Sequence, residues 1–142
     1  MKQVEQFVKD SGLTDSMAVD RASDRIVIRM KSAILFSEAK AELTPQAKEV
    51  LSGLAPVLAR SPSRLRVEGH TDDVPIRSAA FPSNWELSTA RAISVIQYLE
   101  DEGLARERLS VAGYGEFHPF VPNDSSEHRA LNRRVEIVVV GG

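Results

Sequence analysis

Apolar residues recur along the first thirty positions with two different periods. Three of them follow helical spacing and precede Gly12, which predicts a short helix over 2–10. Apolar and polar residues then alternate in 16–20 and again in 25–30, with polar residues between the two stretches. This second pattern predicts a β-hairpin directly after the helix.

Two longer stretches carry apolar residues at helical spacing, and each begins with a capping signal. In the first, Thr44 precedes Pro45, which combines a capping residue with proline at the first helical position, and we expect this helix to end before Pro62. In the second, Ser83 and Glu86 have the spacing of a capping box. The faces predicted to be buried are Ala47, Val50, Leu51, Leu54 and Leu58 in the first helix and Ala92, Val95, Ile96 and Leu99 in the second.

The stretches after these helices alternate like strands. In the first of them, Glu68 and His70 alternate with apolar residues, so we expect a half-buried strand with its polar residues directed outward. The segment 32–43 is ambiguous between strand and loop, and 113–132 is predicted to be a long polar loop. The predicted strands cover 64–70, 109–113 and 135–139.

The order of these elements predicts an α+β fold. Two helices can cover only one face of a small sheet, so we expect an α/β two-layer sandwich with helices on one face of a mixed sheet. The element order is β-α-β-α-β-β, preceded by the short helix and the hairpin. We divide the chain into residues 1–24, a linker helix with the start of the hairpin, and residues 25–142, the folded domain.

Composition narrows the possible functions. The 142 residues carry 20 acidic and 18 basic side chains, a net charge of −2, whereas nucleic-acid-binding domains are usually clearly basic. The absence of cysteine excludes disulfides, thiolate zinc sites and cysteine nucleophiles. The longest apolar runs are far shorter than the roughly 18 residues that cross a bilayer, and the amphipathic start of the chain is unlike a signal peptide. These features predict a water-soluble domain with no nucleic-acid partner.

The second predicted helix carries a polar stripe near its amino-terminal end. Asn84 and Arg91 are seven residues apart, hence within about 20° of each other around the helix, and Ser88 lies between them. We expect this stripe to point away from the core, toward the loop that carries Asp72 and leads into the same helix end. A carboxylate and a guanidinium that face each other across a shallow pocket suit a zwitterion, because one accepts an ammonium and the other grips a carboxylate.

Simpler roles compete for these residues. Asp72 and Arg91 could instead form a surface salt bridge, worth about 0 to 1 kcal/mol, and Asp73 could serve only to turn the loop. Metal binding by His70 with the two aspartates is disfavoured, because no second histidine lies at helical spacing. We interpret His70 as a hydrogen-bonded residue at a strand end and assign no metal ligands.

Other polar and aromatic residues also have two interpretations. Arg129, Arg133 and Arg134 either hold loops together or add a second anion contact. Only one of Arg133 and Arg134 can face the ligand side, because neighbours in a strand alternate. Trp85, the only tryptophan, either packs at the helix start or lies under a sugar ring. A hydrolase nucleophile is not indicated, because no G-x-S-x-G occurs and Ser88 lies within a predicted helix.

Several short motifs occur in a fixed order: H-T-D at 70–72, N-x-x-L-S-x-x-R-A at 84–92, G-Y-G at 113–115 with Pro119 and Asn123 following, and N-R-R-V at 132–135. Taken in this order, they resemble the OmpA-like peptidoglycan-binding domain over about residues 26–140. The ordered set is much more specific than any one motif. Within that family, G-H-T-D-D from Gly69 and F-P-S-N-W-E-L-S from Phe81 are similar to the MotB-type subunit of the bacterial flagellar stator.

The resemblance implies a non-catalytic anchor in the periplasm that holds the peptide stem of peptidoglycan and needs no cofactor. In the family, the motif aspartate and arginine grip the zwitterionic end of diaminopimelate, and these match Asp72 and Arg91. The motif asparagine matches Asn84, and the first arginine of N-R-R matches Arg133. The ligand-binding residues expected from the resemblance and the polar stripe are Asp72, Arg91, Asn84, Thr71, Leu87, Ser88, Arg133 and Arg129.

MotB-type proteins also carry an amino-terminal membrane helix with an ion-carrying aspartate, for which this sequence has no counterpart. We therefore expect either a fragment whose parent is anchored in the inner membrane, where a MotA-type channel subunit would be its partner, or another periplasmic member of the family. In both cases we expect a homodimer. The alternatives are an outer-membrane-linked or soluble cell-wall anchor, and a wall-acting enzyme that uses Asp72 and Asp73 as acid and base.

Overall fold

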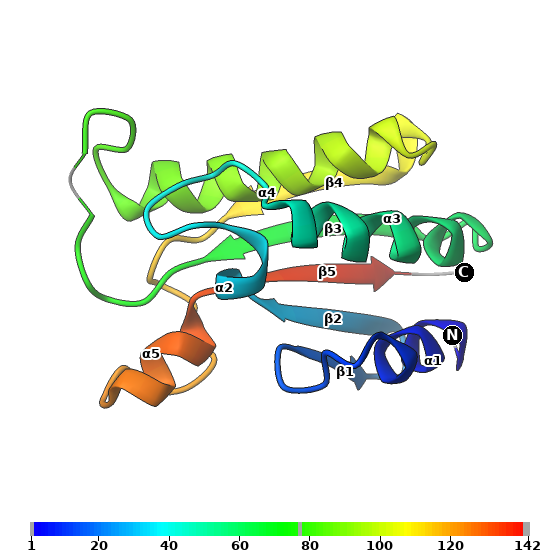
Figure 1. Ribbon diagram of the computed structural model, residues 1–142, viewed down its shortest axis with the longest axis horizontal. Coiled ribbons are helices and arrows are strands. Elements are labelled where there is room, and N and C mark those ends of the chain that lie inside the picture. The colour runs from blue at the N-terminus through cyan, green and yellow to red at the C-terminus, as the bar shows by residue number, and fades with distance from the viewer. Residues whose placement is uncertain (1, 77, 141–142) are drawn as a thin grey trace.

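The computed structural model describes residues 2–76 and 78–140, and its centre is a five-stranded mixed sheet (Figure 1). The strand order is β1-β2-β5-β3-β4. Only β3 and β4 run parallel, and the other neighbouring strands are antiparallel. The strands are β1 (Met17–Arg21), β2 (Arg25–Lys31), β3 (Arg64–His70), β4 (Leu109–Gly113) and β5 (Arg134–Val140).

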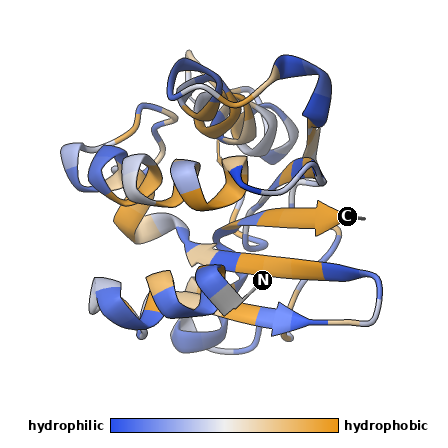
Figure 2. Cartoon of the chain, turned by 90° about the vertical axis from the view of Figure 1, so that its right-hand side faces the viewer, coloured by the Kyte–Doolittle hydropathy of each residue, from blue (hydrophilic) through white to orange (hydrophobic). Residues whose placement is uncertain are grey.

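Helices cover one face of this sheet, which confirms the predicted two-layer α+β fold. α3 and α4 pack side by side, α4 also lies over β3 and β4, and α1 packs against α3 and β1. Figure 2 shows that the strand leading to the carboxyl terminus is hydrophobic toward its end, where β5 carries the run 137–140. The helices are α1 (Lys2–Ser11), α2 (Ser32–Leu35), α3 (Pro45–Ala59), α4 (Asn84–Asp101) and α5 (Ser126–Asn132), with a 3₁₀ turn, η1, at Arg106–Arg108.

Both long helices begin where the capping residues predict. The Thr44 hydroxyl accepts a hydrogen bond from the backbone N–H of Ala47 at 3.1 Å, and Pro45 is the first helical residue. The Ser83 hydroxyl accepts from the backbone N–H of Trp85 at 3.2 Å. Each bond satisfies one of the N–H groups that a helix start leaves without a partner, an effect worth about 1 kcal/mol.

Two glycines allow α4 to approach the sheet closely. A Cβ added to Gly69 would lie 2.0 Å from the carbonyl oxygen of Ser88, and a Cβ added to Gly113 would lie 2.0 Å from Oγ1 of Thr89. The first half of α4 therefore rests almost directly on the backbone at the ends of β3 and β4. This contact fixes the distance between the start of α4 and the loop that follows β3.

Two segments differ from their sequence predictions. The ambiguous stretch 32–43 forms α2 and a single antiparallel bridge between Phe36 and Leu43. The predicted long loop contains α5, whose Ser125 hydroxyl accepts from the backbone N–H of His128 at 3.1 Å. Helices this short are not stable alone and form through tertiary contacts, so their sequences carry little helical periodicity.

The amino-terminal residues share the core of the rest of the chain. Val4, Val8 and Met17 are buried and belong to the same hydrophobic cluster as the residues of the sheet and α3. The division of the chain at residue 24 stays a prediction. None of the helices in the described residues is long and apolar enough to cross a membrane.

Candidate functional site

A cavity of about 600 Å³ opens at the end of the sheet where β3 finishes and β5 begins. The loop that follows β3 forms one wall, α2 and the loop after it form the opposite wall, and the start of α4 lies between them. Figure 1 shows both chain termini at the other end of the sheet. The cavity is lined by Ser32, Ala33, Phe36, Glu38, Ala39, Thr71, Asp72, Val74, Pro75, Ile76, Asn84, Leu87, Arg91 and Arg133.

Asp72 supplies the buried negative charge of the cavity. It is 6% exposed, and its Oδ2 accepts a hydrogen bond from Nη1 of Arg133 at 2.6 Å. Its Oδ1 accepts from the backbone N–H of Val74 at 3.1 Å, so the carboxylate also shapes the loop. The alternative in which Asp72 forms a salt bridge with Arg91 is wrong, because the partner of Asp72 is Arg133.

Arg91 supplies a buried positive charge with uncharged partners. It is 6% exposed, its Nε donates to the carbonyl of Lys40 at 2.8 Å, and its Nη2 donates to the carbonyl of Ser37 at 3.2 Å. Burial, together with the nearby charge of Arg133, lowers the pKa of Arg91 to about 10. Within the described residues Arg91 forms no ion pair, so an anion that enters the cavity would find a charged donor without a competing carboxylate.

The guanidinium of Arg91 also holds the far wall of the cavity in place. Its carbonyl partners, Ser37 and Lys40, flank Ala39, whose φ of 59° lies in the left-handed region that residues with a Cβ rarely adopt. The Phe36 ring lies 4.9 Å from the guanidinium carbon. Nothing in the sequence signalled that this loop belongs to the site, because its contacts with Arg91 depend on packing between distant segments.

Asn84 joins the loop after β3 to the start of α4. Its side-chain amide donates to the carbonyl of Val74 at 3.1 Å and to Oε1 of Glu116 at 3.3 Å, with a longer contact of 3.5 Å to the carbonyl of Asp72. Asn84 is buried, and Leu87 and Thr71 complete this side of the cavity. As predicted, Asn84 of the polar stripe faces the loop that carries Asp72; loops from elsewhere in the chain also cover the stripe, so its residues are buried.

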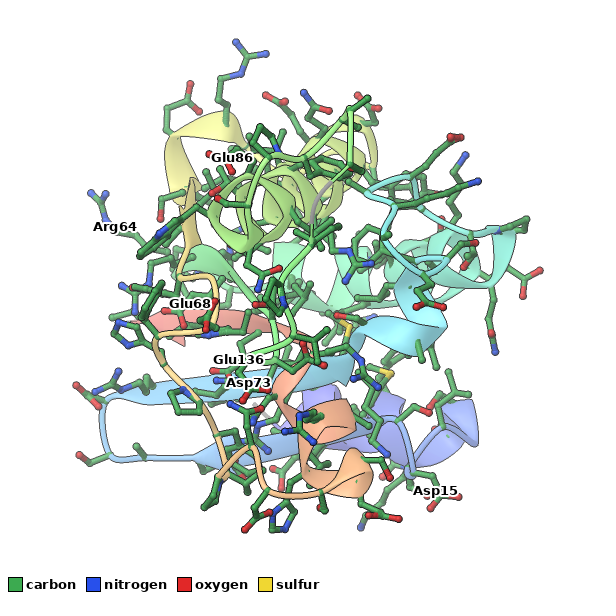
Figure 3. The ribbon with its side chains drawn as sticks, turned by 90° about the vertical axis from the view of Figure 1, so that its left-hand side faces the viewer. Asp15, Arg64, Glu68, Asp73, Glu86 and Glu136 are labelled. Atoms are coloured by element: carbon green, nitrogen blue, oxygen red, sulfur yellow. The ribbon has the colours of Figure 1, made fainter. Side chains whose placement is uncertain are left out.

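Two predicted ligand residues lie outside the cavity lining. Ser88 is fully buried, and its hydroxyl donates to the carbonyl of Trp85 at 3.1 Å and accepts from the N–H of Gly115 at 3.0 Å. Arg129 donates to Oδ1 of Asp73 at 2.9 Å. Asp73, labelled in Figure 3, is thus more than a turn residue, because it ties the loop after β3 to α5. Both contacts hold loops that border the cavity.

Arg133 and Arg134 face opposite sides, as the alternation of strand residues predicts. Arg133 lines the cavity, whereas Arg134 is buried and donates from Nη2 to the carbonyl of His118 at 3.0 Å. Arg134 also pairs with Glu136 at 2.5 Å. Of the two, only Arg133 can take part in binding at the cavity.

A second buried polar cluster lies on the sheet face opposite the long helices. Glu68 and Glu136 are directly opposite each other on β3 and β5 (Figure 3), and Nε2 of His70 lies 3.3 Å from Oε1 of Glu68. Arg66 pairs with Glu68 at 2.7 Å, and Arg134 pairs with Glu136. Each carboxylate is therefore already neutralised by an arginine, and we assign no metal ion to this group. The prediction that the polar residues of this strand face solvent is wrong, because Tyr114 stacks on His70.

Glu68→Gln is expected to destabilise the fold by about 2 kcal/mol at pH 7 and by less in acid. Burial favours a higher pKa for Glu68, but the hydrogen bonds with His70 and Arg66 outweigh it and hold the pKa below its ordinary value. Ionised Glu68 therefore stabilises the fold above the unfolded-state pKa of about 4.3. That contribution is lost as the pH falls through the lower folded-state pKa.

Thermal unfolding of both proteins from pH 7 to pH 3 tests this expectation. The difference in Tm between the unmodified chain and the Glu68→Gln variant should narrow as the pH falls. A difference that stays constant over this range would show that the charge of Glu68 does not stabilise the fold.

The sheet, the helix layer and the cavity with both charges define a small α+β domain with a preformed polar binding pocket. A family model described as the OmpA family matches residues 35–133, and this chain belongs to that family.

Curated relatives and solved structures support the same placement. Motility protein B of Bacillus subtilis is 36% identical over 143 residues, and the match covers 97% of this chain and 54% of that protein. The uncharacterized protein YtxE of the same organism is 39% identical over 140 residues, covering 98% of this chain and 58% of the relative. The chain thus spans little more than half the length of these curated relatives.

Two solved structures share the fold over almost their whole length. The cell wall anchor of the T6SS from Pseudomonas aeruginosa has a TM-score of 0.91 at 34% identity, covering 98% of this chain and 97% of that one. A putative MotB-like protein from Desulfovibrio vulgaris has a TM-score of 0.92 at 33% identity, and the match covers 99% of this chain and 91% of that one. The recognition of an OmpA-like domain with MotB relatives is confirmed.

Proposed function

We propose that this chain is a non-catalytic domain that binds peptidoglycan in the periplasm and anchors a flagellar stator of the MotB type to the cell wall. The observation that carries the proposal is the cavity in which Asp72 and Arg91 are both buried yet belong to different polar networks. A zwitterionic group can then meet a carboxylate and a guanidinium that do not neutralise each other.

The roles of the charged residues follow from their partners. Arg91 has N–H groups beyond the two that bind Ser37 and Lys40, so it can grip the carboxylate of a stem peptide. Asp72 accepts the ammonium of the same amino acid, and Arg133, whose side chain is 46% exposed, swings to a second carboxylate. These contacts resemble those that the OmpA-like motifs imply for diaminopimelate.

Anchoring requires more than one such contact. A single open pocket of this kind binds one stem peptide weakly, whereas two linked copies on one polymer gain effective concentration and hold firmly. A homodimer with both cavities directed away from the chain termini is the arrangement we propose. A MotA-type channel subunit would be its partner through the membrane-embedded part of a longer protein.

Two neighbouring aspartates provide a matched test of the site. Asp72→Asn should weaken co-sedimentation with purified sacculi about 10- to 100-fold, because hydrogen bonds to a charged group are worth about 1.5–3 kcal/mol. Asp73→Asn removes the same charge one residue away, outside the cavity lining, but keeps a side-chain oxygen that can accept the hydrogen bond from Arg129. The loop should then stay in place, and this variant should bind like the unmodified chain.

Binding to sacculi is compared only among variants that thermal unfolding shows to be folded. If both variants pellet with sacculi as well as the unmodified chain does, the cavity is not the peptidoglycan site. If the sacculi release soluble muropeptides during incubation, and Asp72→Asn stops the release, the protein is an enzyme and the proposed anchor function fails.

A cell-wall anchor of a secretion system is the second candidate, favoured by the T6SS anchor structure. The two functions differ in the membrane complex that the anchor holds. A chimaera that carries this chain in place of the matching region of Bacillus subtilis motility protein B should restore swimming if the stator role is correct. A chimaera that is produced and binds sacculi but leaves the cells non-motile would favour the second candidate.

A further inference from the structure

Two exposed aromatic side chains stack on each other beside the cavity. Trp85 is 48% exposed and Phe117 is 58% exposed, although aromatic residues usually lie largely buried. Their ring centroids are 4.8 Å apart, and the ring planes differ by 21°. Gly115 underlies both rings, since a Cβ there would lie 3.6 Å from each of them. The loop backbone thus underlies two stacked, solvent-exposed rings, which we call the aromatic pair.

The aromatic pair is attached to the cavity wall by two polar residues. Asn84, which lines the cavity, directly precedes Trp85, and Glu116 directly precedes Phe117. The side-chain amide of Asn84 donates to Oε1 of Glu116 at 3.3 Å. Each residue of the aromatic pair is therefore next in the chain to a residue of the hydrogen bond that Asn84 makes at the cavity wall.

We propose that the aromatic pair is a glycan subsite that binds the amino-sugar chain of peptidoglycan while the cavity holds its peptide stem. This inference rests on the proposed function. One face of a hexose ring is a sheet of C–H groups, which suits the electron-rich face of an aromatic ring. The second carboxylate oxygen of Glu116 can accept a hydrogen bond from a sugar hydroxyl or an N-acetyl N–H. Because stem and glycan are covalently joined, weak binding at one site raises the effective concentration at the other.

Phe120 provides the matched control for this surface. It is 45% exposed, similar to Trp85, but the Arg29 guanidinium carbon lies 3.9 Å from the centre of its ring. A cation already occupies that ring face, so Phe120 should not receive a sugar. Exposure alone therefore does not define the subsite: within the described residues, a cation lies on the ring of Phe120 and none lies on the aromatic pair.

The only tryptophan of the chain reports directly on this subsite. Peptide-free glycan strands, prepared by amidase digestion of sacculi, should change the fluorescence of Trp85 in a saturable way. Phe117→Leu should weaken this binding about fivefold, because aromatic contacts of this kind are worth about 0.5–1.5 kcal/mol. Phe120→Leu should leave it unchanged. Thermal unfolding confirms that both variants are folded.

A parallel titration with a free stem peptide, monitored by calorimetry, distinguishes failure of the glycan subsite from failure of the proposed function. If the peptide binds and glycan strands do not change the fluorescence of Trp85, the glycan subsite is refuted and the proposed function stands. If neither ligand binds, both fail. Equal weakening by Phe117→Leu and Phe120→Leu would also overturn the assignment, since the effect would then not be specific to the aromatic pair.

Discussion

Gly69→Ala should lower the stability of the fold by about 3 kcal/mol or more, enough to reduce Tm by about 10 °C. The added methyl group would lie 2.0 Å from the carbonyl oxygen of Ser88, an atom of the α4 backbone. A backbone atom cannot rotate aside as a side chain can, so α4 must move off the sheet. Differential scanning calorimetry of the unmodified chain and of Gly69→Ala measures the difference in Tm.

Gly53→Ala is the matched control for this prediction. Its added methyl group would also be too close to a neighbour, at 2.6 Å from the Phe7 ring, but this ring belongs to a side chain that can shift. Alanine is also favoured over glycine inside a helix by about 1 kcal/mol. We therefore expect a change of Tm within a few degrees. Equal destabilisation by both substitutions would contradict the close approach of α4 to β3.

Arg91→Ala should reduce the affinity for sacculi by at least tenfold and also destabilise the protein. Binding falls because the guanidinium is the charged donor of the cavity, and charge-assisted hydrogen bonds are worth about 1.5–3 kcal/mol. Stability falls because the carbonyls of Ser37 and Lys40 lose their donor. Co-sedimentation and thermal unfolding measure the two effects separately.

Two further variants show whether the guanidinium itself is required. Arg91→Lys keeps the charge but cannot reach both carbonyls and a ligand carboxylate with one planar group, so we expect it to recover little binding. Arg106→Ala removes an arginine that pairs with Glu100 at an exposed position, and it should bind sacculi like the unmodified chain. Unchanged binding by Arg91→Ala would remove this residue from the proposed site.

Local sequence determined most of the secondary structure. The caps at Thr44 and Ser83, the helical stripes of the long helices and the alternation in the strands all use interactions among neighbours in the chain. The class of fold followed, because two amphipathic helices can cover only one face of a small sheet. The presence of Asp72 and Arg91 at one cavity was also predictable, because the loop after Asp72 leads directly into the helix that carries Arg91.

Only the tertiary structure decided how these two charges are used. Arg91 binds the carbonyl of Lys40 from 51 positions away, and Asp72 binds Arg133 from 61 positions away. The pairing depends on which loops meet at the end of the sheet, and neighbouring residues carry no information about that. The burial of Ser88 and the cavity wall formed by residues 36–40 also depend on which distant segments pack together. The sequence alone thus determined the elements and the principal charges, whereas long-range packing decided their partners, their burial and the cavity between them.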